Sequence, residues 1–396
     1  MEQDVSASIF HGVTDVGMDP VFGLDEVFLK DPRKNKITLL AGVCLDEDGG
    51  APKIYRAVRL AEKEIYEIES TKTYLPIDGD REYVTETQKM IFGDHHSDRI
   101  YGAQTQGGTS ALNIGCEFLK DHVAEGICTS SPTWANHAQI FHRVGINFDY
   151  YPYWDGQFDF EKMVQHLKQV APRTAILLQP MCHNPTGHDL TTEQWETLSN
   201  LFHEKKIIPF FDTAYQGFGH GIEEDAKPIR LMLEHGHEFI VAHSFSKSMG
   251  IYGERVGAFF IVMRDCAQRD KLARKVKSII RTDYSNPSKH GAFIAKFILK
   301  KPELYQLWQD ELKTIRDRIQ NIRSVFSEKL SEKIPSKSFD YIKNGRGFFS
   351  LLGLSKEQVD KLREEHAIYM AHSSRINLAA INQNNIDIIV DAIAKV

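Results

Sequence analysis

Short apolar segments alternate with helical patterns from about residue 99 to 264, and this alternation limits the possible folds more than any other feature. Several of these segments are apolar throughout, as expected for strands of a mostly parallel sheet covered on both faces. Helical patterns such as TSALNIGCEFLKDH and TTEQWETLSNLFHEKK lie between them, and the second opens with Thr191 and Gln194 spaced as a capping box. The alternation predicts an α/β domain. The apolar segments are RIYGAQT, GICTSS, INFDYYPY, TAILLQPM, IIPFFDT, EFIVAHS and RVGAFFIVM.

The pattern changes after residue 301. A long amphipathic helix is expected to begin at Pro302, since proline is favoured in the first turn of a helix. A short β segment, GFFSLLG, a helix that starts at Ser355, and a terminal helix follow, which together predict a smaller α+β unit. KITLLAGV near the N-terminus is expected to pack with it. We therefore divide the chain into 1–45 (N-terminal arm and part of the small domain), 46–301 (large domain) and 302–396 (small domain).

The composition excludes several classes of protein. The chain has 396 residues, of which 42% are hydrophobic and 26% charged, as in ordinary soluble proteins. A net charge of −6, mixed along the chain, gives no sign of a nucleic-acid partner. MEQDVSASIFHGV lacks the features of a secretion signal, and no apolar run is long enough for a membrane span. The 5 scattered cysteines lack metal-ligand spacing and favour a reducing compartment, so we expect a cytoplasmic protein without a metal site.

Polar residues follow the predicted strands, where ligands of open α/β sheets bind. After RIYGAQT, Gly107 and Gly108 precede Thr109 at the start of a helix. The free N–H groups of a helix N-terminus suit an anion, although a tight turn would explain the glycines equally well. Asn184 follows the strand TAILLQPM in the segment CHNPTG.

The next two strand ends carry charged side chains. Asp212 comes directly after IIPFF, and Tyr215 follows in the segment DTAYQGFG, although an acid at this place can also be a cap or turn residue. Lys247 follows EFIVAHS, within HSFSKSMGIYGERVG, and Arg255 lies farther along the same segment. A lysine beside a buried strand is costly unless its charge is used or suppressed, and the hydroxyls and Arg255 around it suit an anionic group. The alternative is an exposed lysine in a surface turn.

Together, the four strand ends provide an anion site, an amide, a carboxylate with a phenol, and an amine with an arginine. This set fits pyridoxal phosphate, because a lysine can form an imine with its aldehyde and a carboxylate can keep its ring nitrogen protonated. Asn184 and Tyr215 would contact the ring oxygen. Trp134 of SPTWANH could stack on the ring, or it could be an ordinary core or interface residue.

The sequence resembles the class I pyridoxal-phosphate-dependent aminotransferases, and within them the aspartate and aromatic amino acid aminotransferase subgroup. Its lysine segment, SFSKSMGIYGERVG, matches the family signature, and TYLPIDG, QGGTSAL, PTWANH, CHNPTG, FDTAYQGF, RTDYSNP and SSRINLA occur in the family's order. The resemblance covers about residues 10 to 396. It implies fold type I, with a mostly parallel large domain and a smaller α+β domain. It also implies a homodimer with shared active sites, in which an arm of roughly Met1 to His11 lies on the neighbour.

The resemblance also implies residue roles. Lys247 would carry the imine and move the proton between the substrate α-carbon and the cofactor. Asp212, supported by His137, would pair with the ring nitrogen, and Asn184 and Tyr215 would contact the ring oxygen. The implied phosphate contacts are Gly108, Thr109, Ser244 and Arg255, with Tyr74 of TKTYLPIDG reaching across from the partner subunit.

Two arginines are implied to bind the substrate. Arg375 of SSRINLA would bind the α-carboxylate bidentately, helped by Asn184, Trp134 and the backbone of Gly42. Arg281 of IIRTDYSNP, from the partner subunit, would bind the side-chain carboxylate of a dicarboxylic acid. An exposed arginine on a basic helix is the alternative. The implied reaction is a ping-pong transfer of the amino group of aspartate, or of aromatic amino acids such as tyrosine and phenylalanine, to 2-oxoglutarate.

Some positions depart from the subgroup. Gln179 stands where a histidine is frequent, and Cys44 and Leu351 stand where aspartate-selective members commonly have aromatic side chains. SPTWANH, YGERVG and YQGFGHGIEEDA are at least as similar to aromatic-accepting members, so the preferred donor stays open.

Two other classes of function share the cofactor. A lyase or β-decarboxylase on the same scaffold would use the same lysine and aspartate, and glutamate formation from 2-oxoglutarate would distinguish it. A non-catalytic sensor of the cofactor would need an added DNA-binding helix pair, for which the sequence has no spare segment.

Overall fold

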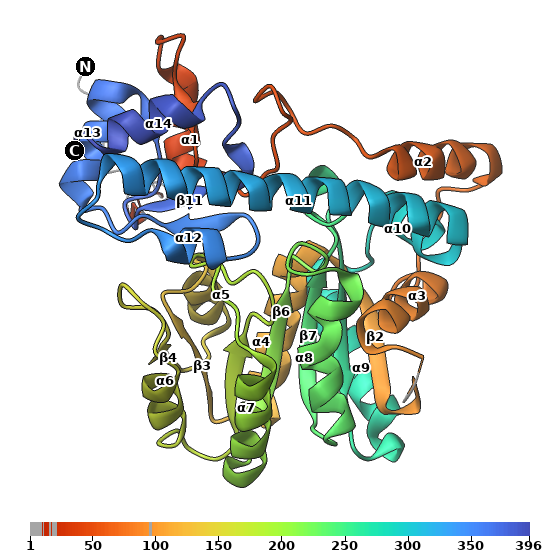
Figure 1. Ribbon diagram of the computed structural model, residues 1–396. Coiled ribbons are helices and arrows are strands. Elements are labelled where there is room, and N and C mark those ends of the chain that lie inside the picture. The colour runs from red at the N-terminus through yellow and green to blue at the C-terminus, as the bar shows by residue number, and fades with distance from the viewer. Residues whose placement is uncertain (1–9, 11, 16, 18–21, 95–96) are drawn as a thin grey trace, which may run out of the picture.

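The computed structural model describes residues 10, 12–15, 17, 22–94 and 97–396. Apart from Phe10, the arm expected over Met1 to His11 lies outside the described residues. A seven-stranded sheet of order β2-β8-β7-β6-β5-β3-β4 forms the lower part of the molecule in Figure 1. β8 is antiparallel to β2 and β7, and the other pairs are parallel, so the mostly parallel sheet is confirmed. The strands are β2 (Ile100–Gln106), β3 (Gly126–Ser131), β4 (Phe148–Pro152), β5 (Thr174–Leu178), β6 (Ile208–Thr213), β7 (Phe239–Ser244) and β8 (Val256–Val262).

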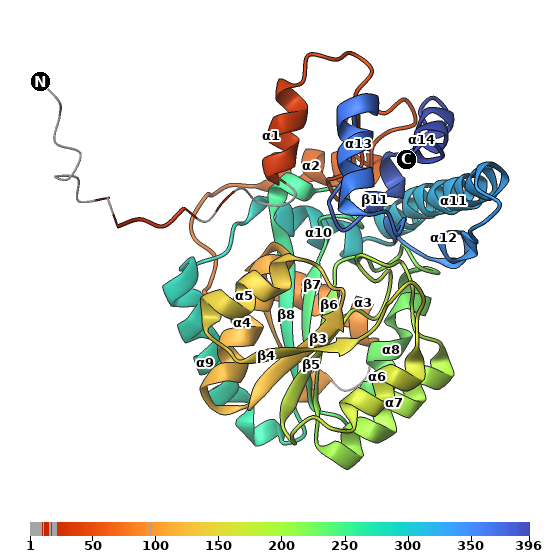
Figure 2. The same cartoon turned by 90° about the vertical axis from the view of Figure 1, so that its left-hand side faces the viewer.

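Helices cover both faces of this sheet (Figure 2), which explains why several of its strands are apolar throughout. Phe210 and Phe211 of β6 are both fully buried, yet they belong to two different apolar clusters because successive side chains point to opposite faces. The cluster of Phe210 includes residues of α4 (Gly107–His122), α5 (Asn136–Val144) and α9 (Arg269–Asp283). The cluster of Phe211 includes residues of α3 (Arg81–Phe92), α6 (Phe160–Leu167), α7 (Thr192–Lys205), α8 (Ile222–Glu234) and α10 (His290–Lys300).

A second group of elements lies above the carboxyl ends of the strands (Figure 1). The 32-residue helix α11 (Pro302–Lys333) runs across the molecule, as the sequence predicts. β1 (Ile37–Thr38) pairs with β10 (Ile368–Tyr369), which confirms that KITLLAGV packs with the C-terminal part, and β9 (Phe349–Leu351) pairs with β11 (Arg375–Asn377). The remaining α-helices of the described residues are α1 (Phe22–Lys30), α2 (Arg56–Ile68), α12 (Asp340–Asn344), α13 (Lys356–His366) and α14 (Ile386–Ile393).

Local sequence signals fix several of these boundaries. The capping boxes at Thr191 and Ser355 are both formed. The side chains of Gln194 and Gln358 accept hydrogen bonds from the backbone N–H groups of Thr191 and Ser355, respectively. None of the helices in the described part of the chain is both long and apolar enough to span a membrane.

Candidate active site

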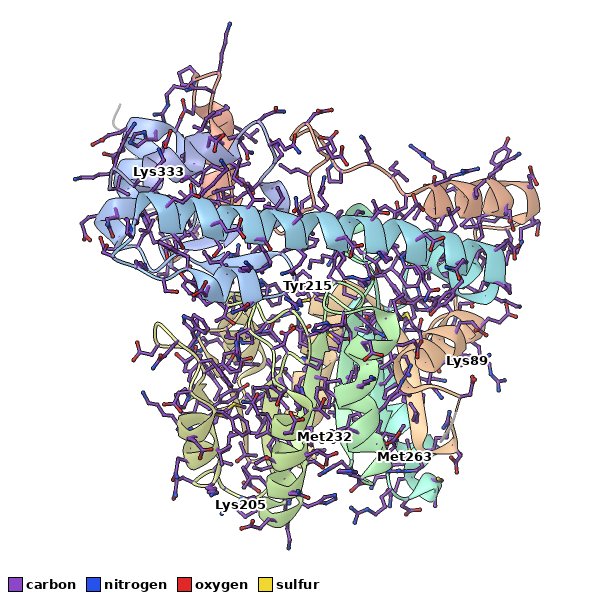
Figure 3. The ribbon with its side chains drawn as sticks, viewed as in Figure 1. Lys89, Lys205, Tyr215, Met232, Met263 and Lys333 are labelled. Atoms are coloured by element: carbon purple, nitrogen blue, oxygen red, sulfur yellow. The ribbon has the colours of Figure 1, made fainter. Side chains whose placement is uncertain are left out.

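Lys247 lies in the loop that follows β7, close to the ring of Tyr215. Its Nζ lies 5.1 Å from the centroid of the Tyr215 ring, and Figure 3 shows Tyr215 beneath α11 at the top of the sheet. Burial lowers the pKa of the Lys247 ammonium to about 8, with Asp212 opposing this shift and Arg255 and Arg375 adding to it. A lysine with a lowered pKa has more of the neutral amine that acts as a nucleophile.

Asp212, at the end of β6, is oriented by a chain of hydrogen bonds. Its Oδ2 lies 3.1 Å from Nε2 of the fully buried His137, and the other ring nitrogen of His137 lies 2.8 Å from Thr133 Oγ1. Thr133 in turn lies 3.3 Å from Thr129 Oγ1. Trp134 contacts the edge of the His137 ring, with the ring centroids 5.2 Å apart. A buried carboxylate held in one orientation can pair with a protonated ring nitrogen.

An anion-binding cradle lies where α4 begins. The side chain of the N-cap residue, Gln106, accepts no hydrogen bond from the first N–H groups of this helix. A Cβ atom at Gly107 would lie 2.6 Å from Arg255 Nη2, and one at Gly108 would lie 3.1 Å from Ser244 Cβ. Glycine at these positions therefore lets the helix N-terminus approach Arg255 and Ser244 closely. The arrangement suits a phosphate.

Two further hydroxyls belong to this cradle. Ser246 Oγ accepts a hydrogen bond from Arg255 Nη1 at 3.3 Å and lies 3.1 Å from Ser244 Oγ. Thr109 lies in the first turn of α4 and is half-buried. The cradle thus combines neutral donors with a guanidinium, which is the donor set that phosphate oxygens prefer.

Arg375, in β11, brings a buried positive charge to the same region. Its Nη1 donates to Asn184 Oδ1 at 3.3 Å, and its Nη2 donates to the carbonyl oxygen of Leu40 at 2.7 Å. The guanidinium lies 4.2 Å from the centroid of the Phe349 ring. Its Nε is buried and lacks a hydrogen-bond partner among the described residues. Burial lowers the pKa of Arg375. A buried guanidinium cation is stabilised by a carboxylate partner, so the position suits a carboxylate ligand.

Gly42 and Tyr215 border the same space. A Cβ atom at Gly42 would lie 3.1 Å from Phe349 Cζ and 3.6 Å from Tyr215 Oη, so the segment of Gly42 passes close to both rings. Tyr215 is buried, and burial raises the pKa of its phenol, so it is a neutral hydrogen-bonding group at ordinary pH.

The structure brings most of the predicted site residues together, but two lie apart. Tyr74 is 90% exposed, and Arg281 is exposed at the end of α9, where it donates to Ser285 Oγ. Both were assigned to the site of a partner subunit, so their exposure in a single chain leaves these roles as predictions. The described residues contain no group of three or more histidine, cysteine or acidic side chains suited to a metal ion.

Several contacts in the site were not assigned from the sequence. Thr133 orients His137, Ser246 joins the anion cradle, and Phe349 underlies Arg375. The hydroxyl spacing around Lys247 pointed to an anion but did not single out Ser246. Phe349 is apolar, so nothing in its side chain pointed to a binding site. It lies here because its strand, β9, pairs with β11, the strand of Arg375.

The three positions that depart from the subgroup lie around the site. The backbone N–H of Cys44 donates to Tyr252 Oη at 3.1 Å, and its Sγ lies 3.0 Å from Arg318 Nη2. Leu351 is paired with Arg375 across β9 and β11. Gln179 directly follows β5 and contacts the backbone of Asn184.

Comparisons with known proteins agree with this geometry. Residues 34–393 match the family of class I and II aminotransferases. The chain is 41% identical to the aspartate aminotransferase of Haemophilus influenzae, over 98% of this chain and 100% of the relative. It is 37% identical to the aromatic-amino-acid aminotransferase of Escherichia coli K12, over 98% and 100% of the two chains. The structure of an aromatic-amino-acid aminotransferase from Burkholderia pseudomallei, covalently bound to pyridoxal phosphate, superposes with a TM-score of 0.93 at 40% identity, covering 98% and 99% of the chains.

Proposed function

The chain belongs to the class I and II aminotransferase family and is a pyridoxal-phosphate-dependent aminotransferase; from this we propose that it transfers the amino group of aspartate or of aromatic amino acids to 2-oxoglutarate. The observation that carries the proposal is the convergence of Lys247, Asp212 and Arg375, which come from three different strands or strand ends and interact electrostatically. An amine, a carboxylate and a carboxylate-binding cation are what amino transfer requires. A lyase is not favoured, because the related proteins are aminotransferases.

The described residues fit the cofactor. The glycines at the start of α4 leave room for a phosphate beside Arg255, and Asp212 provides the buried carboxylate for the ring nitrogen. We propose that Gly108, Thr109, Ser244 and Arg255 bind the phosphate, and that Asn184 and Tyr215 contact the ring oxygen. Trp134 and His137 complete the site on the side of Asp212.

The bound cofactor supplies an electron-accepting ring that stabilises negative charge at the substrate α-carbon. The protein controls the proton and the orientation. Lys247, with a pKa lowered to about 8, can accept a proton from the α-carbon and return one near neutral pH. Asp212 would keep a proton at the ring nitrogen, and its hydrogen bond with His137 fixes the orientation of the carboxylate. Arg375 holds the α-carboxylate, with Asn184, Trp134 and the Gly42 backbone beside it, and so orients the bond that is broken.

A homodimer is part of the proposal. Several large apolar side chains of α2 and the segment after it are exposed in the single chain, which marks a surface that another protein chain would cover. Tyr74 and Arg281 are exposed too, and we propose that each reaches the site of the partner subunit. Figure 1 shows α2 at one edge of the molecule. The exposed apolar residues are Leu60, Tyr66, Ile68 and Tyr74.

Substrate choice rests on two features. We propose that the partner's Arg281 binds the side-chain carboxylate of aspartate, glutamate or 2-oxoglutarate. Cys44 and Leu351 are smaller than aromatic side chains, which supports a site wide enough for aromatic donors as well.

The wider organisation is proposed on similar grounds. We propose domain boundaries at residues 45 and 301, which follow the change from the large sheet to the smaller sheets. They separate an arm with part of the small domain, a large cofactor domain and a small domain. All 5 cysteines are unpaired, which supports a cytoplasmic location.

A panel of amino donors tests the proposal. Purified protein loaded with pyridoxal phosphate is given 2-oxoglutarate and, in separate reactions, aspartate, phenylalanine, tyrosine and alanine. Formation of glutamate and the matching 2-oxo acid in equal amounts is expected with aspartate, with the aromatic donors, or with both. Loss of aspartate without glutamate would indicate a lyase instead.

A further inference from the structure

Gln179 makes two hydrogen bonds with the backbone of one residue of the proposed site. Its Oε1 accepts a hydrogen bond from the backbone N–H of Asn184 at 2.9 Å, and its Nε2 donates to the backbone carbonyl of Asn184 at 3.1 Å. Gln179 follows directly after β5, so its own backbone is anchored by the sheet. One primary amide thus holds both polar backbone groups of Asn184.

The rest of this loop is held by other side chains. Asp189 accepts from the N–H groups of Cys182 and His183, at 2.8 and 3.0 Å. The residue after Asn184 is Pro185, which has no N–H to donate. Within the described residues, the hydrogen bonds of the Asn184 backbone all go to Gln179.

The side chain of Asn184 contacts Arg375. Its Oδ1 accepts from Arg375 Nη1 at 3.3 Å, across the boundary between the large sheet and β11. Rotation of the Asn184 backbone would move this oxygen away from Arg375. It would also move the amide that we assign to the cofactor ring oxygen.

We propose that Gln179 is a positioning residue, which fixes the backbone of Asn184 and thereby aims its side chain at Arg375 and at the cofactor ring. The inference rests on the proposed function, since the roles of Asn184 and Arg375 belong to it. A histidine could not replace the pair of bonds. The two nitrogens of an imidazole point in diverging directions, whereas the oxygen and nitrogen of an amide lie side by side and match the N–H and carbonyl of one residue.

The test compares Gln179→Leu with a matched control, Gln358→Leu. Gln358 also makes two backbone hydrogen bonds, accepting from Ser355 N at 2.9 Å and donating to the carbonyl of Val396 at 2.7 Å. It belongs to α13 and has no part in the proposed site. Both substitutions remove the same groups, so general destabilisation is expected in both.

Only Gln179→Leu is expected to change the site. The KM for aspartate and 2-oxoglutarate should rise about tenfold, the effect of one lost hydrogen bond of about 1.4 kcal/mol, while kcat changes less. Without substrate, the pH at which the visible absorption band of the bound cofactor changes should shift, because Asn184 no longer contacts the ring oxygen in the same way. In Gln358→Leu, the KM values and the pH of the spectral change should stay as in the unmodified protein.

A second variant covers the case in which Gln179→Leu does not fold. Gln179→Glu keeps an acceptor for the N–H of Asn184 but turns a second acceptor toward its carbonyl, so it should show the same rise in KM and the same spectral shift. Unchanged KM and unchanged spectral pH dependence in the variants that fold would overturn the proposal. If the unmodified protein bound the cofactor but transferred no amino group, the proposed function would fail instead.

Discussion

Trp308 donates its indole N–H to the carbonyl oxygen of Ser248, with a nitrogen–oxygen distance of 2.7 Å. Trp308 belongs to the long helix α11, and Ser248 directly follows Lys247. The bond is buried, since Trp308 is only 1% exposed. The long helix is therefore tied to the loop that presents the reactive lysine, although the sequence assigned no residue of this helix to the site.

We expect Trp308→Phe to destabilise the protein by about 1–3 kcal/mol, because the buried carbonyl of Ser248 loses its donor. Urea unfolding of the cofactor-free protein measures this change. Trp195→Phe is a matched control, since the buried indole N–H of Trp195 lacks a partner among the described residues. Its substitution should cost clearly less. An equal loss in the two variants would mean that the bond to Ser248 is not important for stability.

The lowered pKa of Lys247 predicts a pH dependence of stability in the cofactor-free protein. The amine has a pKa of about 8 in the folded chain and an ordinary value of 10.5. Between these values the unfolded chain binds more protons than the folded one, so the free energy of unfolding should rise with pH. Below pH 8 both forms are protonated and this contribution is flat.

Lys247→Met provides the comparison, because it removes the titrating amine and keeps an unbranched side chain. As the pH rises from 8 to 10.5, the free energy of unfolding of the unmodified protein should increase relative to that of Lys247→Met. Parallel pH profiles over this range would show that Lys247 has an ordinary pKa.

Asp212→Ala should slow removal of the substrate α-proton by orders of magnitude, because the ring nitrogen would lose the carboxylate that keeps it protonated. Asp212→Glu keeps the charge with shifted geometry and should retain more activity. Exchange of the aspartate α-proton with deuterated solvent, followed by NMR, measures this step. Equal loss in both variants, with no cofactor bound to either, would point to a role in folding.

The sequence predicted those parts of the site that depend on strand ends. Asn184, Asp212 and Lys247 follow successive apolar segments, and the carboxyl ends of parallel strands meet at one edge of a sheet. The caps at Thr191 and Ser355 were predictable for a similar reason, since each depends on residues within one turn.

Contacts between distant segments were not predictable from these signals. Phe349 under Arg375 and Trp308 against Ser248 depend on how the C-terminal elements pack on the large sheet, and apolar side chains carry no mark of their partner. The placements of Tyr74 and Arg281 depend on a second copy of the chain. Pattern analysis of one chain cannot locate these side chains.

The two arginines should have different effects on substrate choice. Arg281→Ala is expected to lower kcat/KM for aspartate, glutamate and 2-oxoglutarate by at least about 10–100-fold, because a side-chain carboxylate would lose a charge-assisted bond of about 1.5–3 kcal/mol. Phenylalanine and tyrosine should be affected much less in the half-reaction. Arg375→Ala should impair all substrates, since all carry the α-carboxylate.

Mixed dimers add a check on which subunit supplies Arg281. A dimer of one Lys247→Ala subunit and one Arg281→Ala subunit would have one site with both residues intact, and should recover aspartate activity. A uniform loss for aspartate and phenylalanine in Arg281→Ala would rule out the role in binding the side-chain carboxylate.

The central claim is that the chain is an aminotransferase whose reaction depends on Lys247. The most direct test measures glutamate formation from 2-oxoglutarate and the best donor of the panel. The unmodified protein and Lys247→Ala are compared. Lys247→Ala should still bind pyridoxal phosphate through Asp212 and the anion cradle, as measured by cofactor release after denaturation. The account predicts steady glutamate formation by the unmodified protein and almost none by the cofactor-loaded variant. Near-normal turnover by Lys247→Ala would contradict it.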